Sequence, residues 1–391
     1  IVQTPSGSRK VSKPILVLGA SGIVGRALGQ VLLKSTAVPL RLASRSLKTS
    51  EGLCGELSGG KTWSRLQPVK CDVTDRAAME KAMDGASTVI VCSATRSRIM
   101  GIAEAALSSG CELIDIHWSP TLWPEARRYH KKFEEKGLSW ITEGGCHPGL
   151  PGALVRWAAD HLDDLETVRV SAAISFKNAA GPVSSIEFAR EISQVRMGVV
   201  EEGEWNEMSM SRPKATKVDF GEPLGVKKCY PFHLHEIIQA ARDLGGVKQA
   251  SFCIAQGPWL LDMVAMPIAG LMTSKIPRLA RPAGALLRRM ANLTSSKTNG
   301  AQFLLEASGQ EEGKEASLRL SIGHRDPAWL TSLCVSSCLH QMTHGGLEKG
   351  VQMMALAVEP RLFISEIVAH GGDFELTSSG IQPQPSVRVP K

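Results

Sequence analysis

A glycine-rich turn follows a short apolar run near the start of the chain. Residues 15–18 read Ile-Leu-Val-Leu, residues 19–25 read Gly-Ala-Ser-Gly-Ile-Val-Gly, and residues 26–34 carry apolar side chains at helical spacing. A continuous apolar run of this length is typical of a strand buried on both faces of a parallel sheet. A strand, a glycine turn and a helix in this order predict an anion site, because unpaired backbone N–H groups and the helix dipole point at the ligand.

The spacing of the three glycines matches the fingerprint of dinucleotide-binding domains. Gly19 permits the turn, Gly22 lets the backbone approach a pyrophosphate, and Gly25 allows the helix to pack closely on the strand. The alternative is a domain of the same fold that has lost its ligand. We expect every residue of this glycine loop to contact the cofactor: Gly19, Ala20, Ser21, Gly22, Ile23, Val24 and Gly25.

Six apolar stretches separated by helical patterns follow one another up to residue 142. They cover residues 15–18, 39–43, 69–71, 88–92, 112–116 and 138–142. Strands that alternate with helices in this way predict a doubly wound parallel sheet of the Rossmann type. In such a sheet the ligand lies along the carboxyl ends of the strands.

The chain has 391 residues, which is more than one hydrophobic core usually supports. Its character changes near Gly144, and the apolar stretches beyond residue 168 are longer, as in an open mixed sheet. We therefore predict an α/β fold with an inserted α+β domain. The expected parts are a flexible tail (1–13), a Rossmann domain (14–150), a substrate or dimerisation domain (151–325), helices that pack back on the Rossmann domain (326–375) and a second flexible tail (376–391).

The end of the second strand carries information about the cofactor. An NAD site usually has an acidic residue there, about 20 residues beyond the glycines. Residues 43–46 read Ala-Ser-Arg-Ser, without a carboxylate. Ser44 and Arg45 can instead hold a 2′-phosphate, the arginine through charge-assisted hydrogen bonds; a solvated surface role for Arg45 is the alternative. We predict NADP(H), with NAD less favoured.

Further cofactor contacts are expected where the third and fourth strands end. Asp72 is placed to accept a hydrogen bond from the adenine amino group, or else to cap the following helix. The end of the fourth strand should pass near the ribose and the nicotinamide. The candidates at these two strand ends are Asp72, Val73, Ser93 and Ala94.

A second glycine-rich loop covers residues 144–152, which read Gly-Gly-Cys-His-Pro-Gly-Leu-Pro-Gly. A loop at the carboxyl edge of a parallel sheet faces the ligand crevice, and its glycines let the backbone come close to a ligand. We predict His147 as a catalytic or substrate contact and Gly149 as a further cofactor contact. A solvent-exposed or structural role for His147 is the alternative.

These motifs resemble those of saccharopine dehydrogenase-like oxidoreductases. The resemblance rests on the glycine loop, Ser44-Arg45, Ile114-Asp115, the loop at 144–152 and the segment 350–371. It implies a Rossmann domain, an inserted α/β substrate domain and NAD(P)-linked oxidation or reduction of a carbon–nitrogen bond or a related group. The family generally has another residue at the position of His147. Saccharopine itself would need convergent arginines, and no such cluster is recognisable between residues 168 and 256.

Other chemistries find less support in the sequence. Short-chain dehydrogenases need a Tyr-x-x-x-Lys pair, but Phe133 follows Tyr129 and Leu234 follows Tyr230 at that spacing. A zinc site is imaginable from four residues that fit more simply on one helix face, so no metal is predicted. These four are Cys334, Cys338, His340 and His344. One of His233, His235 and Glu236 could face a substrate, although a turn followed by an alternating strand is the simpler interpretation.

Charge and cysteine content bound the partners and the compartment. The net charge of +7 is spread along the chain, and only 5% of residues are aromatic, so no nucleic-acid partner is predicted. Nine cysteines without a Cys-x-x-Cys pair favour a reducing compartment. The chain begins with Ile1, so we predict either the cytoplasm or an organelle stroma or matrix, the latter reached after removal of a targeting segment.

Residues 257–293 mix leucines and methionines with five basic residues. We expect a dimer-forming helix pair there, with peripheral contact to an anionic membrane as the alternative. For the whole chain we predict an NADP(H)-dependent oxidoreductase acting on a small or lipid-like substrate, as a homodimer or within a complex. The alternative is a dinucleotide-binding accessory or assembly subunit without turnover, because no acid or base stands out in the sequence.

Overall fold

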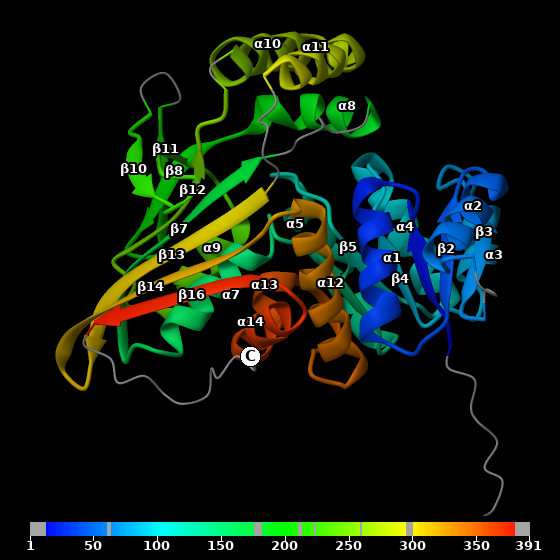
Figure 1. The fold of residues 1–391 in the computed structure, drawn as a ribbon, viewed down its shortest axis with the longest axis horizontal. Helices are drawn as coiled ribbons and strands as arrows, with labels where there is room; N and C mark the ends of the chain where they lie inside the picture. The colour runs from blue at the N-terminus through cyan, green and yellow to red at the C-terminus, as the bar shows by residue number, and fades with distance from the viewer. Residues whose placement is uncertain are drawn as a thin grey trace, which may run out of the picture.

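The computed structural model describes residues 13–60, 64–175, 182–209, 213–222, 224–258, 260–294 and 300–379. They form two sheets with helices between and around them (Figure 1). Among the described helices, none is long and apolar enough to cross a membrane.

The first sheet is parallel and has the strand order β15-β6-β5-β4-β1-β2-β3. Its strands are β1 (Ile15–Leu18), β2 (Leu40–Ser44), β3 (Leu66–Lys70), β4 (Thr88–Val91), β5 (Glu112–Asp115), β6 (Ser139–Thr142) and β15 (Gly350–Met353). The predicted doubly wound sheet is confirmed, with one strand more than expected. The third strand begins before residue 69, because β3 lies at the sheet edge, where Pro68 is tolerated.

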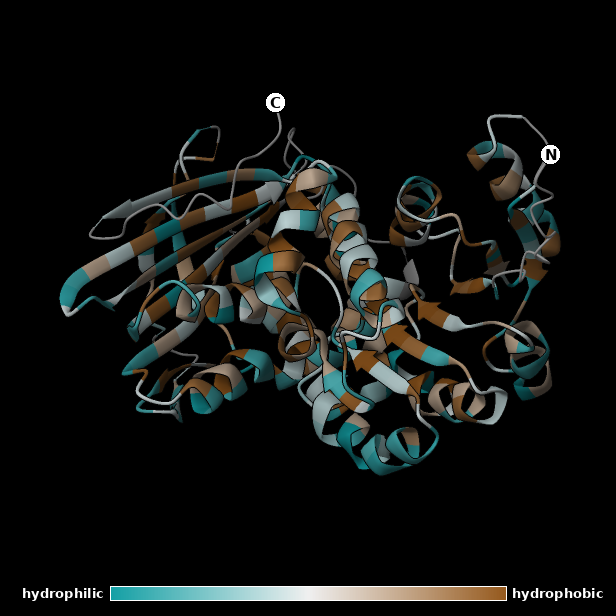
Figure 2. Ribbon diagram, turned by 90° about the horizontal axis from the view of Figure 1, so that it is seen from below, coloured by the Kyte–Doolittle hydropathy of each residue, from teal (hydrophilic) through white to brown (hydrophobic). Residues whose placement is uncertain are grey.

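Helices cover both faces of this sheet. They are α1 (Ile23–Ser35), α2 (Leu47–Leu57), α3 (Arg76–Met83), α4 (Ile99–Ser109), α5 (Leu122–Ala126), α6 (His130–Glu135) and α7 (Leu150–Ala159). Ile15 and Val17 of β1 belong to one core cluster, and Leu16 and Leu18 belong to another. The strand is therefore buried on both faces, and Figure 2 shows the hydrophobic strands among the helices.

The second sheet is mixed and has the order β10-β11-β12-β7-β13-β14-β16; β8 also pairs with β12, and β9 pairs with β8. Its strands are β7 (Asp164–Ser175), β8 (Met197–Glu201), β9 (Glu204–Met208), β10 (Thr216–Asp219), β11 (Val226–Pro231), β12 (Gln249–Ala255), β13 (Gly300–Glu311), β14 (Lys314–His324) and β16 (Asp373–Ser379). β7 and β12 run parallel, whereas β7, β13, β14 and β16 pair antiparallel in that order. Helices α7 and α9 (His235–Leu244) pack on one face of this sheet.

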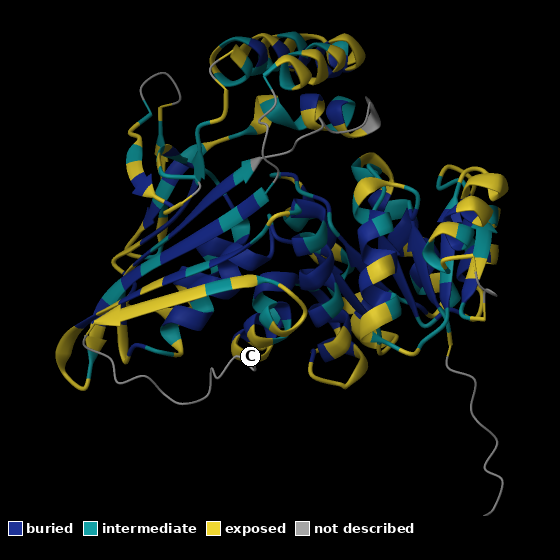
Figure 3. Ribbon diagram, in the orientation of Figure 1, coloured by how far each residue is buried: buried dark blue, intermediate teal, exposed yellow. Residues whose placement is uncertain are grey.

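Helix α8 (Pro182–Glu191) and a 3-10 turn precede β8. Of the two expected flexible tails, residues 1–12 and 380–391 lie outside the described residues. Residues 376–379, which we expected in the C-terminal tail, instead end β16, which pairs with β14. Figure 3 shows this edge strand as largely exposed, which explains why its sequence lacks an apolar signal.

The C-terminal helices join the two sheets. They are α12 (Pro327–Thr343), α13 (Met354–Ala357) and α14 (Pro360–Ala369). The Ser336 hydroxyl of α12 lies 2.9 Å from the Ser35 hydroxyl of α1. One continuous core cluster includes Val17 of the first sheet, Leu339 of α12 and Phe303 of the second sheet. The two domains thus share their largest core.

Three helices stand together at one end of the molecule (Figure 1). They are α8, α10 (Met266–Lys275, preceded by a π-helical turn, Leu260–Ala265) and α11 (Ala280–Leu293). Their small core consists of Ala189, Ala265, Ala269, Ala283 and Leu287. We refer to residues 182–194 and 260–293 as the helical cap.

Candidate functional site

The glycine turn is packed so tightly that side chains are excluded at both of its ends. Gly19 has a φ of +77°, and a Cβ atom there would lie 2.7 Å from the Cβ atom of Ser93. A Cβ atom on Gly25 would lie 2.4 Å from the carbonyl oxygen of Gly19. Only glycine fits both positions without a shift of the backbone. The turn thereby brings β1, α1 and the end of β4 together.

The amino end of α1 is open to an anion. Gly22 is the N-cap residue, no side chain caps the helix, and its first turn contains no acidic residue. The Arg26 Nε atom donates to the carbonyl oxygen of Ser21 at 3.1 Å and closes the turn. Side chains cap some helices, for example α2, α3 and α12 by Ser46, Asp75 and Asp326, whereas α4 lacks a side-chain cap, as α1 does. The uncapped N–H groups of α1 fit the pyrophosphate of a dinucleotide.

The other residues of the glycine loop differ in exposure. Ala20 is buried beneath the turn, and Ser21 and Val24 are half-buried. Gly22 and Ile23 are exposed, Ile23 to 57%. The loop therefore presents backbone and one apolar side chain on its outer side.

Ser44 and Arg45 lie where β2 ends. The Ser44 hydroxyl donates to the carbonyl oxygen of Ser46 at 2.7 Å and lies 2.9 Å from the Ser50 hydroxyl. Arg45 is exposed, and within the described residues its guanidinium makes no hydrogen bond or ion pair. A guanidinium in this situation is available to a phosphate group.

Asp72 is tied to the turn that follows β3. Its Oδ1 atom accepts hydrogen bonds from the backbone N–H and the hydroxyl of Thr74, at 2.9 and 2.8 Å. The backbone bond first, and then the hydroxyl bond, hold the pKa of Asp72 below its ordinary value, and the charge of Arg45 acts in the same direction. Asp75, not Asp72, caps α3, by accepting from the N–H of Ala78 at 3.1 Å. Val73 is half-buried beside it.

A buried Asp–His pair supports the end of β4. Asp115 accepts hydrogen bonds from the His117 N–H at 3.0 Å and from Trp140 Nε1 at 2.7 Å, and the Nδ1 atom of His117 lies 3.1 Å from Asp115 Oδ1. The Nε2 atom of His117 lies 2.9 Å from the Ser93 carbonyl oxygen and 3.3 Å from the Thr95 nitrogen. The Nε2 atom therefore holds the backbone around the half-buried Ala94, while the Nδ1 atom faces Asp115. This pair orients the loop that approaches the glycine turn.

The side chain of Glu236 binds the backbone of the second glycine-rich loop. Glu236, at the start of α9, accepts hydrogen bonds from the N–H groups of Gly149 at 2.8 Å and Gly152 at 3.0 Å. A Cβ atom on Gly152 would lie 3.0 Å from the Cβ atom of Glu236. Burial raises the pKa of Glu236 to about 8, against the opposing effect of the two N–H donors. The N–H of Gly149, which we predicted as a cofactor contact, is thus occupied by Glu236.

His147 lies among aromatic rings. Its ring centroid is 4.9 Å from that of Phe252 and 5.9 Å from that of Phe232. Burial lowers the pKa of His147 to about 4, so the ring is neutral near pH 7. Within the described residues its buried Nε2 atom has no hydrogen-bond partner. The structure therefore places His147 within the loop among aromatic rings, without the charged neighbour that a proton-transfer residue commonly has.

Glu143 is a candidate that the sequence analysis missed. It follows β6 with a φ of +56°, a conformation that non-glycine residues rarely adopt, and it is 2% exposed. No hydrogen bond reaches its carboxyl group from any described residue. Burial first, and then the charges of Glu236 and Asp115, raise the pKa of Glu143 well above 4.5, while Arg96 acts in the opposite direction. The neutral acid is thereby favoured in a strained position.

No role was predicted from sequence for the Asp115–His117 pair or for Glu143, although both stand at recognisable positions in the sequence. Asp115 and His117 stand two residues apart, which places them on one side of an extended segment. Glu143 is the polar residue between the strand at 139–142 and the glycines that follow. The sequence pattern marks these positions as strand ends, but the burial that shifts the pKa of Glu143 depends on distant elements.

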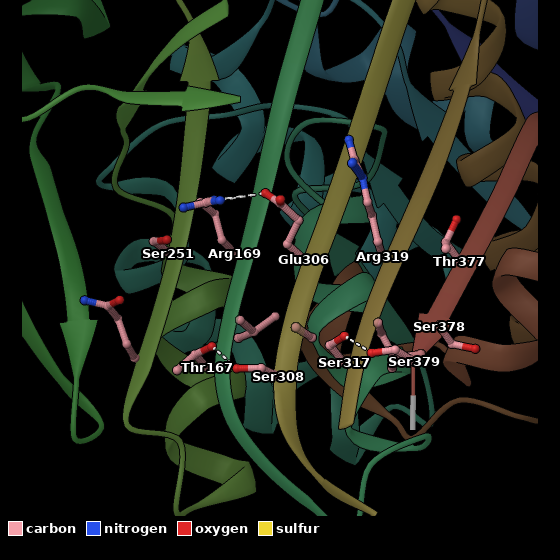
Figure 4. Close-up of a pocket in the computed structure, with 14 residues that line it drawn as sticks. Thr167, Arg169, Ser251, Glu306, Ser308, Ser317, Arg319, Thr377, Ser378 and Ser379 are labelled. Carbon is pink, nitrogen blue, oxygen red and sulfur yellow. Dashed lines mark hydrogen bonds and ion pairs between the residues drawn. The ribbon is translucent and has the colours of Figure 1, made fainter. Parts of the chain in front are cut away.

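Two cavities lie away from the glycine turn. One, of about 470 Å³, is lined by Pro120, Thr121, Ser193, Gln194, Val195, Arg196, Glu207, His233 and His235. His233 and His235 thus share a cavity with a loop of the first domain, and burial lowers the pKa of both. The other, of about 480 Å³, lies on the polar face of the second sheet, where Arg169 pairs with Glu306 at 2.7 Å (Figure 4).

The structure assembles no metal centre among the residues that it describes. Cys334 and Cys338 are buried in α12, and burial raises the pKa of Cys338 to about 12. His340 instead contacts Glu366, and its ring lies 4.3 Å from that of His344. The two cysteines are thus buried within the helix packing, whereas His340 and His344 are exposed.

The fold and the turn define a class of protein. A parallel sheet with a glycine turn at an uncapped helix, joined to a mixed-sheet domain, is the architecture of a two-domain protein that binds a nicotinamide dinucleotide. Residues 15–141 match the family described as "Saccharopine dehydrogenase NADP binding domain". The first domain is thus similar, over these residues, to the NADP-binding domain of saccharopine dehydrogenases.

Solved structures extend the likeness to both domains. Apo saccharopine dehydrogenase (L-Glu forming) from Saccharomyces cerevisiae is similar with a TM-score of 0.69 and 14% identity, covering 94% of this chain and 100% of that one. An engineered D-amino acid dehydrogenase bound to NADP+ has a TM-score of 0.49 and 15% identity, covering 90% and 95%. DAP dehydrogenase of C. glutamicum has a TM-score of 0.46 and 14% identity, covering 90% and 96%. No curated protein matches the chain in sequence.

Proposed function

We propose that this chain is an NADP(H)-dependent oxidoreductase that acts on a carbon–nitrogen or carbonyl group of a small or lipid-like substrate. The observation that carries this proposal is the open amino end of α1, reached through a glycine turn that packs directly on Ser93. The family of the first domain supports the cofactor class. The fold that the chain shares with saccharopine dehydrogenase (L-Glu forming) is in keeping with a carbon–nitrogen substrate.

The chain's own residues would hold the cofactor along the carboxyl edge of the first sheet. The backbone of the glycine loop would hold the pyrophosphate, and Ser44 and Arg45 the 2′-phosphate. Asp72 keeps its Oδ2 atom for the adenine, since the Thr74 bonds use Oδ1. The bound cofactor would supply a hydride, or accept one, at its nicotinamide ring. The loop around Ala94, held by His117 and packed against the glycine turn, would contribute to holding the cofactor.

Glu143 is the residue that we assign to proton transfer. When an imine is reduced, the carbon takes the hydride and the nitrogen takes a proton. A carboxyl group that is kept neutral by burial can give that proton and can take it back in the reverse direction. His117 is a positioning residue in this account, because both of its ring nitrogens face backbone or Asp115. His147 is neutral and remains a candidate for a hydrogen bond to substrate.

The cofactor assignment is tested by binding affinities. We expect the wild type to bind NADPH more tightly than NADH, and Arg45→Ala to lose about 10- to 100-fold in NADPH affinity with little change for NADH, since a charge-assisted contact is removed. Lys48→Ala, which removes an exposed cation from neighbouring α2, is the matched control and should leave both affinities intact. An unchanged preference in Arg45→Ala would refute the assignment of the 2′-phosphate site.

The assignment of Glu143 is tested by turnover. Glu143→Gln keeps the shape of the side chain but cannot transfer a proton, so we expect kcat to fall by about 10²- to 10⁴-fold with NADPH affinity retained. Glu112→Gln is the control, because Glu112 lies at the amino end of β5, whereas Glu143 follows the carboxyl end of β6. Full turnover in Glu143→Gln would remove Glu143 from the mechanism.

A dinucleotide-binding subunit without turnover is the second candidate. It is favoured by the engagement of both ring nitrogens of His117 and by the neutrality of His147, which leave Glu143 as the one acid that we assign. Mass spectrometry of ligands that co-purify with the protein separates the two candidates. A retained nucleotide together with substrate-like molecules supports the enzyme, and a retained nucleotide without any such molecule supports the subunit.

A further inference from the structure

The outer surface of the helical cap is apolar along α10 and the turn before it. Large hydrophobic side chains are exposed there to between 44% and 62%: Leu260, Met263, Ile268, Leu271 and Ile276. The opposite side of the same helix is buried, with Ala269 at 0% and Thr273 at 6% exposed. Figure 3 shows the cap as a mixture of exposed and half-buried segments at the end of the molecule. Several large apolar side chains exposed on one surface helix are typical of an interaction site.

The outer side of α11, which runs beside α10, is basic. Its inner side packs on α8 through Gly284, where a Cβ atom would lie 2.8 Å from the backbone of Ile186. Ala283 and Leu287 are buried on that side, so Arg281, Arg288 and Arg289 lie on the opposite, exposed side. The packing within the helical cap therefore determines which side of α10 and of α11 faces outward.

The charge of this surface is mainly positive. Residues 260–293 contain five basic side chains and a single acidic one, Asp262. The Asp262 carboxylate accepts a hydrogen bond from the N–H of Gly257 at 2.6 Å. The basic residues are Lys275, Arg278, Arg281, Arg288 and Arg289. The surface thus combines exposed leucine and isoleucine with an excess of positive charge.

Two acidic residues of α8 face the first domain. Glu187 of α8 accepts a hydrogen bond from the Arg96 N–H at 3.1 Å, and Glu191 accepts one from the Ser119 hydroxyl at 2.6 Å. Both partners belong to loops of the first domain. The cap is therefore fixed to the first domain through its acidic side, and its apolar and basic side faces outward.

We propose that the outer surface of the helical cap docks on an anionic membrane. Exposed apolar side chains can enter the interface between headgroups and acyl chains while neighbouring arginines pair with anionic headgroups. A second copy of the chain fits less well, because a two-fold contact would bring the five cations of each copy together. The side-by-side placement of an apolar and a basic helix thus favours a lipid surface over the dimer contact predicted from sequence.

The experiment uses the full chain and vesicles of two compositions, neutral phosphatidylcholine alone and phosphatidylcholine with about a third phosphatidylserine. Each basic residue near an anionic surface strengthens partitioning about fivefold. We therefore expect Arg288→Glu/Arg289→Glu to lower co-sedimentation with the anionic vesicles at least twenty-fold, and Leu271→Glu to lower it as well. The matched control is Arg127→Glu/Arg128→Glu, which reverses two adjacent exposed arginines on the first domain.

Salt-sensitive binding of the wild type to anionic vesicles, kept by the control and lost by the two cap variants, would support the proposal. No binding by the wild type, or an equal loss in the control, would overturn it. A dimer in solution that Leu271→Glu converts to a monomer, without any vesicle binding, would assign the surface to a second copy instead. Circular dichroism of each variant verifies that the loss is not a loss of folding.

Discussion

At the scale of single residues, a contact within the chain explains the glycines of the second glycine-rich loop. Its glycines suggested backbone that approaches a ligand, but Gly149 and Gly152 approach the carboxyl group of Glu236. A carboxyl group at the amino end of α7 meets the unpaired N–H groups and the helix dipole. The loop therefore joins the two domains at this point through a buried polar contact.

Glu236→Gln should change how stability depends on pH. Folding raises the pKa of Glu236 from 4.5 to about 8, so the folded state binds a proton that the unfolded state releases between these values. The contribution of Glu236 to stability is therefore present below about pH 4.5 and lost as the pH rises to about 8, by at most about 1.4 kcal/mol per unit. Chemical unfolding of wild type and variant should converge or cross over this range.

The difference in unfolding free energy between the two proteins isolates this one group. Glu315→Gln, which removes an exposed carboxylate of β14, is the control and should give a nearly constant difference. A constant difference for Glu236→Gln between pH 4.5 and 8 would contradict the assigned cause.

Residues whose role follows from local spacing could be predicted, and residues whose role follows from burial could not. Gly19 and Gly25 follow from the turn itself, and both meet the contacts that require glycine. Glu143 and Glu236 lie 93 positions apart in the chain, and each becomes notable only when other elements remove it from water. A sequence pattern alone does not carry that information.

At the scale of elements, the strand–turn–helix unit of β1 and α1 is the most constrained part of the chain. Gly25→Ala would place a Cβ atom 2.4 Å from the Gly19 carbonyl oxygen, so the turn must open. We expect a loss of more than about 1 kcal/mol in stability and a clear loss of NADPH affinity. Gly52→Ala in α2, where nothing lies within 4 Å, should be neutral or stabilising by up to about 1 kcal/mol.

Thermal unfolding and NADPH titration of these two variants compare a packed glycine with an open one. Equal effects of the two substitutions would show that the close approach at Gly25 is not what the turn requires.

The elements that the sequence pattern revealed are those with buried apolar runs. The strands β1, β4 and β5 were predicted because their side chains are buried, apart from the first residue of β5, and therefore form apolar runs in the sequence. β9 and β10 were missed because they are short and largely exposed. β15 was missed for another reason: it completes the first sheet beside β6, more than 200 residues earlier in the chain. Pairing over such a distance leaves no periodic signal.

At the scale of the whole molecule, the shared core predicts cooperative unfolding. Because one cluster links the first sheet, α12 and the second sheet, we expect a single calorimetric transition for both domains. NADPH at 100 times its dissociation constant should stabilise the folded chain by about 2.7 kcal/mol and move that one transition upward. Two transitions, of which NADPH moves only one, would show that the domains unfold independently.

The most direct test of the central claim is whether bound NADPH is consumed. Stoichiometric NADPH is mixed with the wild-type protein and with each member of a panel of imines and carbonyl compounds, both water-soluble and lipid-like, and its oxidation is followed spectroscopically. The account predicts oxidation with at least one member, faster than without protein and much slower with Glu143→Gln. Tight binding of NADPH with no oxidation across the panel would contradict the account and would assign the chain to the non-catalytic class.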